Sequence, residues 1–318
     1  MLAERLRARD LTVAAAVLNL LESASQEARA QADELLERVS PAALRGEAPG
    51  RIVGITGPPG VGKSTLISAL VGVWRTEGRT AAVLAVDPSS RRSGGSLLGD
   101  RARIEHDPGD PSVFIRSMAA GERLGGLAPA TRSAATALAA AFDMVVIETV
   151  GVGQSETEVA DAADAVVVVV QPGSGDVLQF LKAGIMEIPD VLVVNKSDLG
   201  EVALRAAADL EAALASLGQS ATPVLSVCAT APVCATAPAG GVRKLAEAVD
   251  RHLASLELEQ RRARARRTQA LAEFAAEHGA AGLRAIGGRA AAERWLSQLD
   301  GTLAASAMRR ELERRAGR

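Results

Sequence analysis

The fold of this chain is decided by the stretch Ile52-Val-Gly-Ile-Thr-Gly57-Pro-Pro-Gly-Val-Gly62-Lys63-Ser64. Its apolar start predicts a buried strand, and the apolar pattern that follows Thr65 predicts a helix. Between them, glycines let successive backbone N–H groups turn inward toward phosphate oxygens, and the positive end of the helix points at the same anion. This strand–loop–helix order predicts a nucleotide-binding α/β domain.

Two side chains of the loop have predicted chemical roles. Lys63 should reach the β- and γ-phosphates, and the Ser64 hydroxyl should ligate Mg²⁺. Pro58 and Pro59 stand where some ATPases carry a second lysine that acts in trans, which argues against that group. The residues predicted to hold the phosphates are Gly57, Pro58, Pro59, Gly60, Val61, Gly62, Lys63, Ser64 and Thr65.

Short apolar runs continue along the chain and alternate with helical patterns. Because these runs lack polar alternation, they predict strands buried on both faces of a mostly parallel central sheet, with ligands at the carboxyl ends of the strands. We expect a P-loop NTPase domain over residues 49–256, an N-terminal helical extension over 1–48 and a C-terminal helical extension over 257–318. The predicted strands are Ile52–Thr56, Ala81–Val86, Val113–Arg116, Met144–Glu148, Val166–Val170, Val191–Asn195 and Pro223–Val227.

Carboxylates close to the phosphate loop predict a metal site. Glu148 ends a predicted strand, where a buried carboxylate is costly without a partner such as Mg²⁺. Asp87 and Asp100 flank a glycine-rich stretch and resemble a switch loop that closes on Mg²⁺. The predicted metal residues are therefore Ser64, Asp87, Asp100 and Glu148. The predicted catalytic residues are Lys63, Asp100, Glu148 and Gln154, the last as a candidate for positioning water.

A second motif, Asn195-Lys196-Ser197-Asp198, follows the apolar run of residues 191–194. Asp198 can accept two hydrogen bonds from the N1–H and amino groups of guanine, a donor pair that adenine lacks. Asn195 can bond the opposite base edge or tie loops together, and the Lys196 stem can lie along the ring. Cys228, Ala229 and Thr230 follow the next strand and are predicted to offer a backbone contact to the base. GTP is therefore the predicted substrate.

Composition limits the other classes of function. The 318 residues are 48% hydrophobic and 2% aromatic with no Tyr, which predicts a core of Ala, Val and Leu. A net charge of −2 argues against a nucleic-acid partner, and the sequence contains no run of 18 apolar residues, so we expect a cytoplasmic protein without a membrane partner. Beyond residue 255 the chain has 13 Arg and no Lys. Five of them fall on one helical segment that is read as a solvated helix face, or else as a surface for an acidic partner: Arg261, Arg262, Arg264, Arg266 and Arg267. Cys228 and Cys234 occur in a duplicated hexapeptide, read as a loop insertion rather than a metal site.

Taken together, the motifs resemble the MeaB/ArgK-type GTPases, which are chaperones of adenosylcobalamin-dependent acyl-CoA mutases. The resemblance covers roughly residues 5–255. The matching stretches are Gly54–Thr65, Val86-Asp-Pro-Ser-Ser90, Gly94-Gly-Ser-Leu-Leu-Gly-Asp-Arg101, Phe114–Met118, Leu124–Leu127, Glu148-Thr-Val-Gly-Val-Gly-Gln-Ser-Glu156, Pro172–Asp176 with Gln179 and Lys182, and Asn195–Asp198.

The resemblance implies Mg²⁺-dependent GTP hydrolysis coupled to cofactor loading or protection of a mutase, with methylmalonyl-CoA mutase as the first candidate, and a homodimer. It also implies nucleotide-sensing switches at residues 87–101 and 148–156 and a segment facing the mutase at 173–187. This chain departs from the family where Gly121-Glu122 replaces the usual Arg-Gly and where Cys228 replaces a Ser.

Three alternatives remain open at the level of sequence. A nickel-insertion GTPase would need clustered His and Cys, whereas His106, His252 and His278 are widely separated. A nucleotide-dependent kinase or transport ATPase is disfavoured by the guanine motif. A regulatory module whose hydrolysis has decayed is the third alternative, because of the residues at 121–122.

Overall fold

The computed structural model describes residues 1–87, 104–119, 127–149, 154–173, 188–230 and 241–317, except for the side chains of Asp87 and residues 154–157. The chain divides into two compact units. The helical unit contains Met1–Gly50, Arg132–Ala141 and Leu256–Arg318, and the sheet unit contains Arg51–Thr131 and Phe142–Ser255. The three-part division at residues 48 and 256 stays a prediction.

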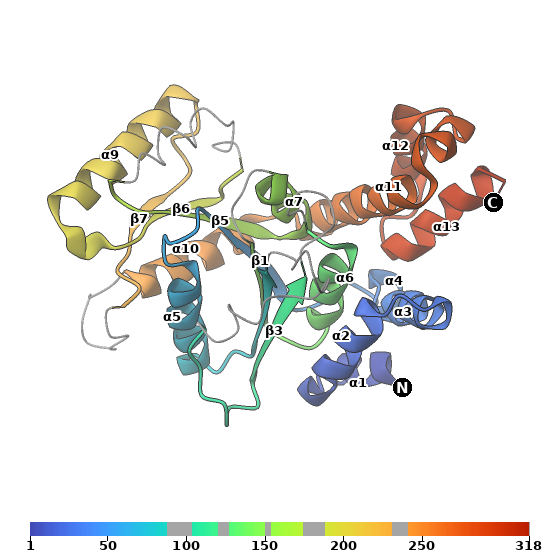
Figure 1. Cartoon of the computed structure of the whole chain (residues 1–318), viewed down its shortest axis with the longest axis horizontal. Helices are drawn as coiled ribbons and strands as arrows, with labels where there is room; N and C mark the ends of the chain where they lie inside the picture. The colour runs from blue at the N-terminus through green and yellow to red at the C-terminus, as the bar shows by residue number, and fades with distance from the viewer. Residues whose placement is uncertain (88–103, 120–126, 150–153, 174–187, 231–240, 318) are drawn as a thin grey trace, which may run out of the picture. The chain divides into compact units, whose positions relative to one another are not determined.

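The sheet unit is built on a seven-stranded sheet in the order β3-β2-β4-β1-β5-β6-β7, and every pairing is parallel (Figure 1). The predicted α/β class with a parallel central sheet is therefore confirmed, and each predicted strand is present. The strands are β1 Arg51–Thr56, β2 Ala81–Asp87, β3 Val113–Ala119, β4 Met144–Glu148, β5 Ala165–Val170, β6 Val191–Val194 and β7 Val224–Ser226.

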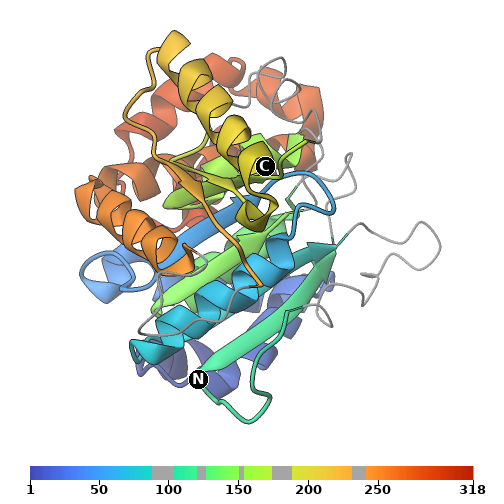
Figure 2. The ribbon, with the colours of Figure 1, turned by 90° about the vertical axis from the view of Figure 1, so that its left-hand side faces the viewer.

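Helices connect these strands and cover the sheet, as expected for parallel crossovers. In Figure 2, α5 runs alongside the strands, and it packs against β2 and α10. Gly54 of β1 allows a close approach of α7, because a Cβ at this position would lie 2.6 Å from Val159 Cγ2. The helices of the sheet unit are α5 Lys63–Thr76, α7 Gln154–Ala162, η4 Ser197–Leu199, α9 Glu201–Ser216 and α10 Val242–Ser255. Most of α6, Pro129–Leu138, belongs to the helical unit.

The core of the sheet unit consists mostly of small aliphatic side chains, as the composition predicts. All six residues of β5 are buried, and so are all five of β4. Trp74 and Phe142 are the large exceptions and are fully buried. Strands buried on both faces leave their carboxyl ends as the place where polar side chains can meet a ligand.

The helical unit draws on both ends of the sequence. Its apolar core includes Leu271, Phe274, Leu296, Met308 and Leu312. No helix in the described ranges is both long and apolar enough to cross a bilayer. The elements are α1 Leu2–Arg7, η1 Leu11–Val13, α2 Ala14–Glu22, α3 Gln26–Arg38, α4 Pro41–Leu44, α11 Leu258–Ala285, α12 Arg289–Gln298 and α13 Ala305–Arg315.

Arginines of α11 correct one interpretation of the sequence. Arg262 is buried and donates to the carbonyl oxygens of Ala48 at 2.8 Å and Gly50 at 2.6 Å. Arg266 donates to Gly301 O and pairs with Glu47. The reading of this segment as a solvated face is therefore wrong for Arg262 and Arg266, because the planar guanidinium donors match carbonyl and carboxylate acceptors brought there by the fold.

Candidate nucleotide-binding site

The loop between β1 and α5 has the backbone conformation that its glycines permit. Gly57, Gly60 and Gly62 have φ values of +145°, +83° and +92°. A Cβ on Gly57 would lie 2.1 Å from Val169 O, and one on Gly62 would lie 2.5 Å from Asn195 Nδ2. Side chains are thus excluded at both ends of the loop, by conformation and by space.

Lys63 begins α5 and curls back over the loop. Its Nζ donates to Gly57 O at 2.7 Å and to Pro58 O at 3.0 Å, and the residue is 8% exposed. The ammonium is thereby held at the loop by neutral carbonyl oxygens. A polyphosphate oxygen, which is charged, would be a stronger acceptor for this donor than either carbonyl.

Ser64 and Glu148 meet beside the loop. Ser64 Oγ donates to Glu148 Oε1 at 2.9 Å, and Glu148 is 4% exposed. The contact follows from the sheet, because β1 pairs with β4 with Ile55 opposite Glu148. A hydroxyl and a buried carboxylate form the all-oxygen donor set that Mg²⁺ prefers, so these two residues fit the predicted ion.

Other predicted residues of this end lie outside the described part of the molecule. Asp100 lies in a range that the structure does not describe. The backbone of Asp87 and Gln154 is described, but their side chains are not. Their roles at the metal and at the attacking water stay predictions.

The predicted base-binding motif begins at the carboxyl end of β6. Asn195 is 2% exposed; its Nδ2 donates to Val61 O at 2.8 Å, and its Oδ1 accepts from Ala229 N at 3.2 Å. Of its two predicted roles, the contacts match the one that ties loops together. Asp198 lies in η4 and is exposed.

Lys196 adopts a left-handed backbone conformation, with φ +58° and ψ +43°. Its Nζ donates to Gly60 O at 3.1 Å and also to Gln171 Oε1. Sequence reasoning missed Gln171. Its position in the sequence could have indicated it, because Gln171 directly follows β5. The neighbours of β5 are β1, which leads into the phosphate loop, and β6, which leads into the base-binding motif.

The segment after β7 supplies one further contact to this end. Ala229 N is bound by Asn195, and Cys228 Sγ lies 3.4 Å from Thr230 Oγ1. The whole second hexapeptide, residues 233–238 with Cys234, lies outside the described residues. The structure thus brings Val61, Asn195 and Ala229 together, which joins the phosphate loop to the base-binding motif.

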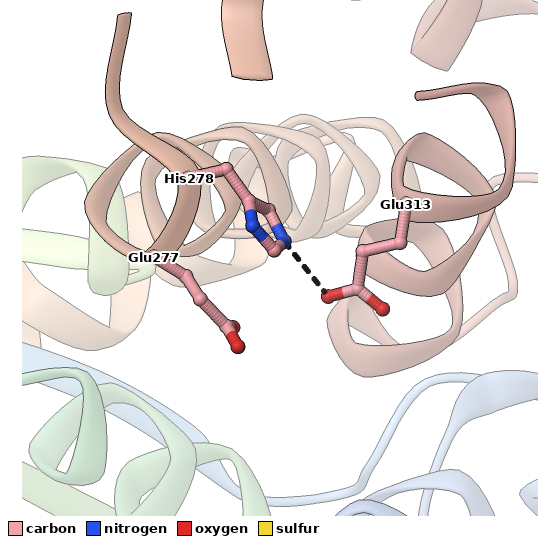
Figure 3. Close-up of side chains that lie close together, drawn as sticks. All are labelled: Glu277, His278 and Glu313. Carbon is pink, nitrogen blue, oxygen red and sulfur yellow. Dashed lines mark ion pairs between the residues drawn. The ribbon is translucent and has the colours of Figure 1, made fainter. Parts of the chain in front are cut away.

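In the part of the helical unit that the structure describes, one group of side chains has the composition of a metal site. Glu277, His278 and Glu313 place ligand atoms within 4.8 Å of one another. Figure 3 shows His278 facing Glu313, with Nε2 3.7 Å from Oε1. However, Arg309 Nη1 lies 3.2 Å from Glu277 Oε2 and 3.3 Å from Glu313 Oε1. A divalent ion would be repelled by this guanidinium, so we assign the group to helix packing.

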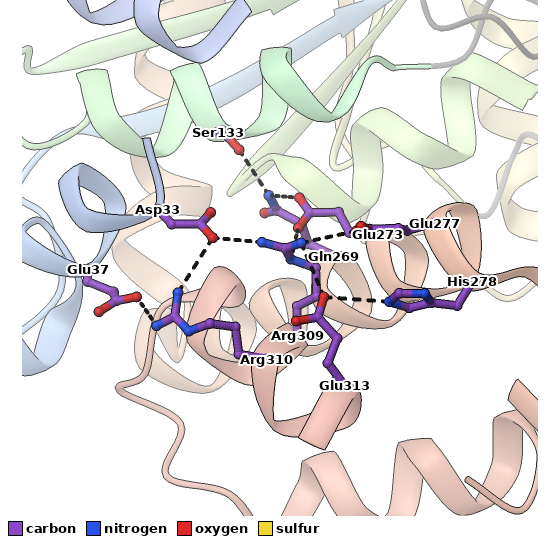
Figure 4. A network of polar contacts seen from close by, with 10 residues as sticks. All are labelled: Asp33, Glu37, Ser133, Gln269, Glu273, Glu277, His278, Arg309, Arg310 and Glu313. Atoms are coloured by element: carbon purple, nitrogen blue, oxygen red, sulfur yellow. Dashed lines mark hydrogen bonds and ion pairs between the residues drawn. The ribbon is translucent and has the colours of Figure 1, made fainter. Parts of the chain in front are cut away.

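Arg309 is the centre of a wider network in the helical unit (Figure 4). Besides Glu277 and Glu313, it approaches Asp33 of α3 at 2.7 Å and Glu273 of α11 at 3.8 Å. Burial raises the pKa of Glu273 above its ordinary value, and the positive charge of Arg309 opposes that rise. One guanidinium thus links three helices through four carboxylates.

The fold and the loop define a class. A parallel sheet whose first strand runs into Gly-x-x-x-x-Gly-Lys-Ser and then a helix is that of a P-loop nucleotide-binding protein. The chain belongs to the family described as methylmalonyl-CoA mutase-associated GTPase MeaB, whose model matches residues 14–281. The predicted family is therefore confirmed.

Individual relatives agree with this assignment. A protein of Pyrococcus abyssi is 48% identical over 198 residues, which are 62% of this chain and 59% of the relative. The GTPase ArgK of Escherichia coli is 40% identical over 198 residues, 61% of this chain and 58% of the relative. The matched part thus spans less than two thirds of either relative. A crystal structure titled LAO/AO transport system kinase is similar with a TM-score of 0.66 and 27% identity, covering 98% of this chain and 95% of that one.

Proposed function

We propose that this protein binds GTP and hydrolyses it to GDP and phosphate with Mg²⁺, and that this cycle serves an adenosylcobalamin-dependent acyl-CoA mutase. Membership of the MeaB family supports the GTPase activity, and the name of that family supports a methylmalonyl-CoA mutase as the partner. The observation that carries the proposal is Asn195, which joins the phosphate loop at Val61 to the base segment at Ala229.

Hydrolysis would use the residues at the loop in a simple division of tasks. The Lys63 ammonium would leave the carbonyl oxygens of Gly57 and Pro58 and bind β- and γ-phosphate oxygens. Ser64 and Glu148 would hold Mg²⁺, which supplies positive charge against the phosphates. Water would attack the γ-phosphorus in line, and the bond to the β–γ bridging oxygen would break. Asp100 and Gln154 remain the proposed additional residues for this step.

Selection of guanine would depend on Asp198. Its carboxylate lies in the short helix directly after Lys196 and is exposed, so it can accept the two donors of a guanine edge. With adenine the same carboxylate would meet no donor pair, which costs affinity because a desolvated acceptor is left unpaired. The kinase and transport-ATPase alternative has no corresponding support in this part of the site.

The decisive test exchanges the carboxylate of Asp198 for an amide. Asp198→Asn should lose GTP affinity and gain affinity for xanthosine triphosphate, since xanthine offers a carbonyl to the new amide donor. Binding of both nucleotides is measured by calorimetry, with Asp209→Asn on the exposed surface of α9 as the matched control. Unchanged preference for GTP in Asp198→Asn would remove this residue from base recognition.

The partner is tested separately from the nucleotide. Tagged protein is incubated with purified methylmalonyl-CoA mutase, with and without a non-hydrolysable GTP analogue, and the mass of the complex is measured. We expect a complex whose amount depends on the nucleotide, and a homodimer of this chain in its absence. Lys63→Ala is the control variant. If it recovers as much mutase as the unaltered protein in every nucleotide state, mutase binding is not coupled to nucleotide binding.

A further inference from the structure

Gln171 occupies the position between the two halves of the proposed nucleotide site. It directly follows β5, and β5 pairs with β1 on one side and β6 on the other. Strand β1 leads into the phosphate loop, and β6 leads into Asn195 and Lys196. The carboxyl end of β5 therefore lies between both motifs, and its first side chain can reach either.

Gln171 contacts Lys196. The ammonium of Lys196 is shared between Gln171 Oε1 and the backbone oxygen of Gly60 in the phosphate loop. Both acceptors are neutral oxygens, and together they fix the position of the ammonium. A lysine stem has four rotatable bonds, and two acceptors on neighbouring strand ends restrict them far more than one would.

The backbone of Lys196 adds to this restriction. Its left-handed conformation is uncommon for a residue with a side chain and persists where the surroundings determine it. On one side the motif is held by Asn195 through Val61 O and Ala229 N. On the other side the Lys196 side chain is held by Gln171 and Gly60. The stem between these anchors is the surface that would lie along the guanine ring.

We propose that Gln171 is a positioning residue for base recognition, which acts by holding the Lys196 ammonium so that the lysine stem forms a fixed wall for guanine. The inference rests on the proposed GTP binding and adds a residue to it. Because GTP and GDP share the base, loss of Gln171 weakens both nucleotides by the same factor. The γ-phosphate end is unaffected, so turnover at saturating GTP does not change.

The test uses four variants of the full-length protein: Gln171→Ala, Gln171→Glu, Lys196→Ala and the double variant Gln171→Ala/Lys196→Ala. Affinities for GDP and a non-hydrolysable GTP analogue are measured by calorimetry, and KM and kcat are measured for GTP. Gln171→Ala should raise both Kd values by roughly 5- to 10-fold, the loss expected for one typical hydrogen bond, with KM raised and kcat unchanged. Gln171→Glu keeps an acceptor and should bind nearly as tightly as the unaltered protein.

The double variant separates positioning from a general structural effect. If Gln171 acts through Lys196, removing it in the Lys196→Ala background has no further effect on either Kd. Gln219→Ala, which lies before β7 at the opposite end of the sheet, is the matched control for loss of a glutamine in this unit and should bind normally.

Three results would overturn the inference. The first is an unchanged nucleotide affinity in Gln171→Ala. The second is a double variant whose fold-change in Kd equals the product of the fold-changes of the two single variants. In either case GTP binding by the unaltered protein would leave the proposed function standing. The third is a failure of the unaltered protein to bind guanine nucleotides, which would overturn the proposed function as well.

Discussion

In the sheet unit, charged side chains of the candidate site are held by neutral groups. Lys63 is held by two carbonyl oxygens, Lys196 by a carbonyl and an amide, and Glu148 accepts from a hydroxyl. In the helical unit, Arg309 is surrounded by four carboxylates, and Arg266 pairs with Glu47 and Gly301 O.

The difference teaches how to distinguish a site from a structural network. A charge held by neutral acceptors can exchange them for a charged ligand, because the new contact is stronger. A charge that already faces several opposite charges gains nothing from a ligand and loses much when a partner is removed. The cluster of Glu277, His278 and Glu313 belongs to the second kind, although its composition alone suggests a metal site.

Replacement of Lys63 is the strongest way to test this contrast. Lys63→Ala removes a cation that donates to the neutral carbonyl oxygens of Gly57 and Pro58. The fold should remain, while affinity for the triphosphate falls on the order of 100-fold and hydrolysis stops. Calorimetry and phosphate release measure the two effects. Lys244→Ala on the exposed surface of α10 is the control. Normal turnover in Lys63→Ala would exclude Lys63 from the mechanism.

Replacement of Arg309 should lower the stability of the fold, whereas replacement of Lys63 should lower nucleotide affinity. Arg309→Met keeps much of the side-chain volume but leaves Asp33, Glu273 and Glu313 without their shared counter-charge. The free energy of unfolding should fall by roughly 3 kcal/mol, as expected when one partner of a largely buried ion pair is removed. Urea denaturation followed by circular dichroism measures it. Arg314→Met, at a side chain that is 69% exposed, should cost far less, and an equal loss in the two variants would contradict the assignment.

The smallest expected effect concerns the pH dependence of stability. Burial is the main cause of the raised pKa of Glu273, whose neighbours include Gln269, Arg309, Asp33 and Arg132. Because the folded protein binds this proton more tightly than the unfolded chain, its contribution to stability is greatest below the ordinary pKa and is lost as pH rises through the folded value. Glu273→Gln has no ionisable group at this position, so it should not lose stability in this way as pH rises.

The measurement is the difference in unfolding free energy between Glu273→Gln and the unaltered protein from pH 4 to pH 8. The difference should move in favour of the variant as pH rises, because the amide keeps a polar group beside Gln269 without a charge to bury. Glu259→Gln on the exposed surface of α11 should show no such trend. A difference for Glu273→Gln that does not vary with pH would contradict the role of its ionisation.

By itself, the sequence determined the seven strands, the parallel α/β class, the phosphate loop and the family. These follow from short stretches: an apolar run long enough for a buried strand, and a glycine-rich loop whose backbone conformation depends on the residues inside it. The contact between Ser64 and Glu148 was also predictable from the sequence. Ser64 ends the loop after one predicted strand, and Glu148 ends another predicted strand.

The partners of long side chains were decided only by the tertiary structure. Arg262 binds the carbonyl oxygens of residues 48 and 50, more than 200 positions away, and Gln171 meets Lys196 only because β5 and β6 are neighbours in the sheet. Strand pairing and helix packing choose such partners from many candidates of equal chemistry. A pattern of residues along the chain contains the donor and the acceptor, but the distance between them exists only in the folded molecule.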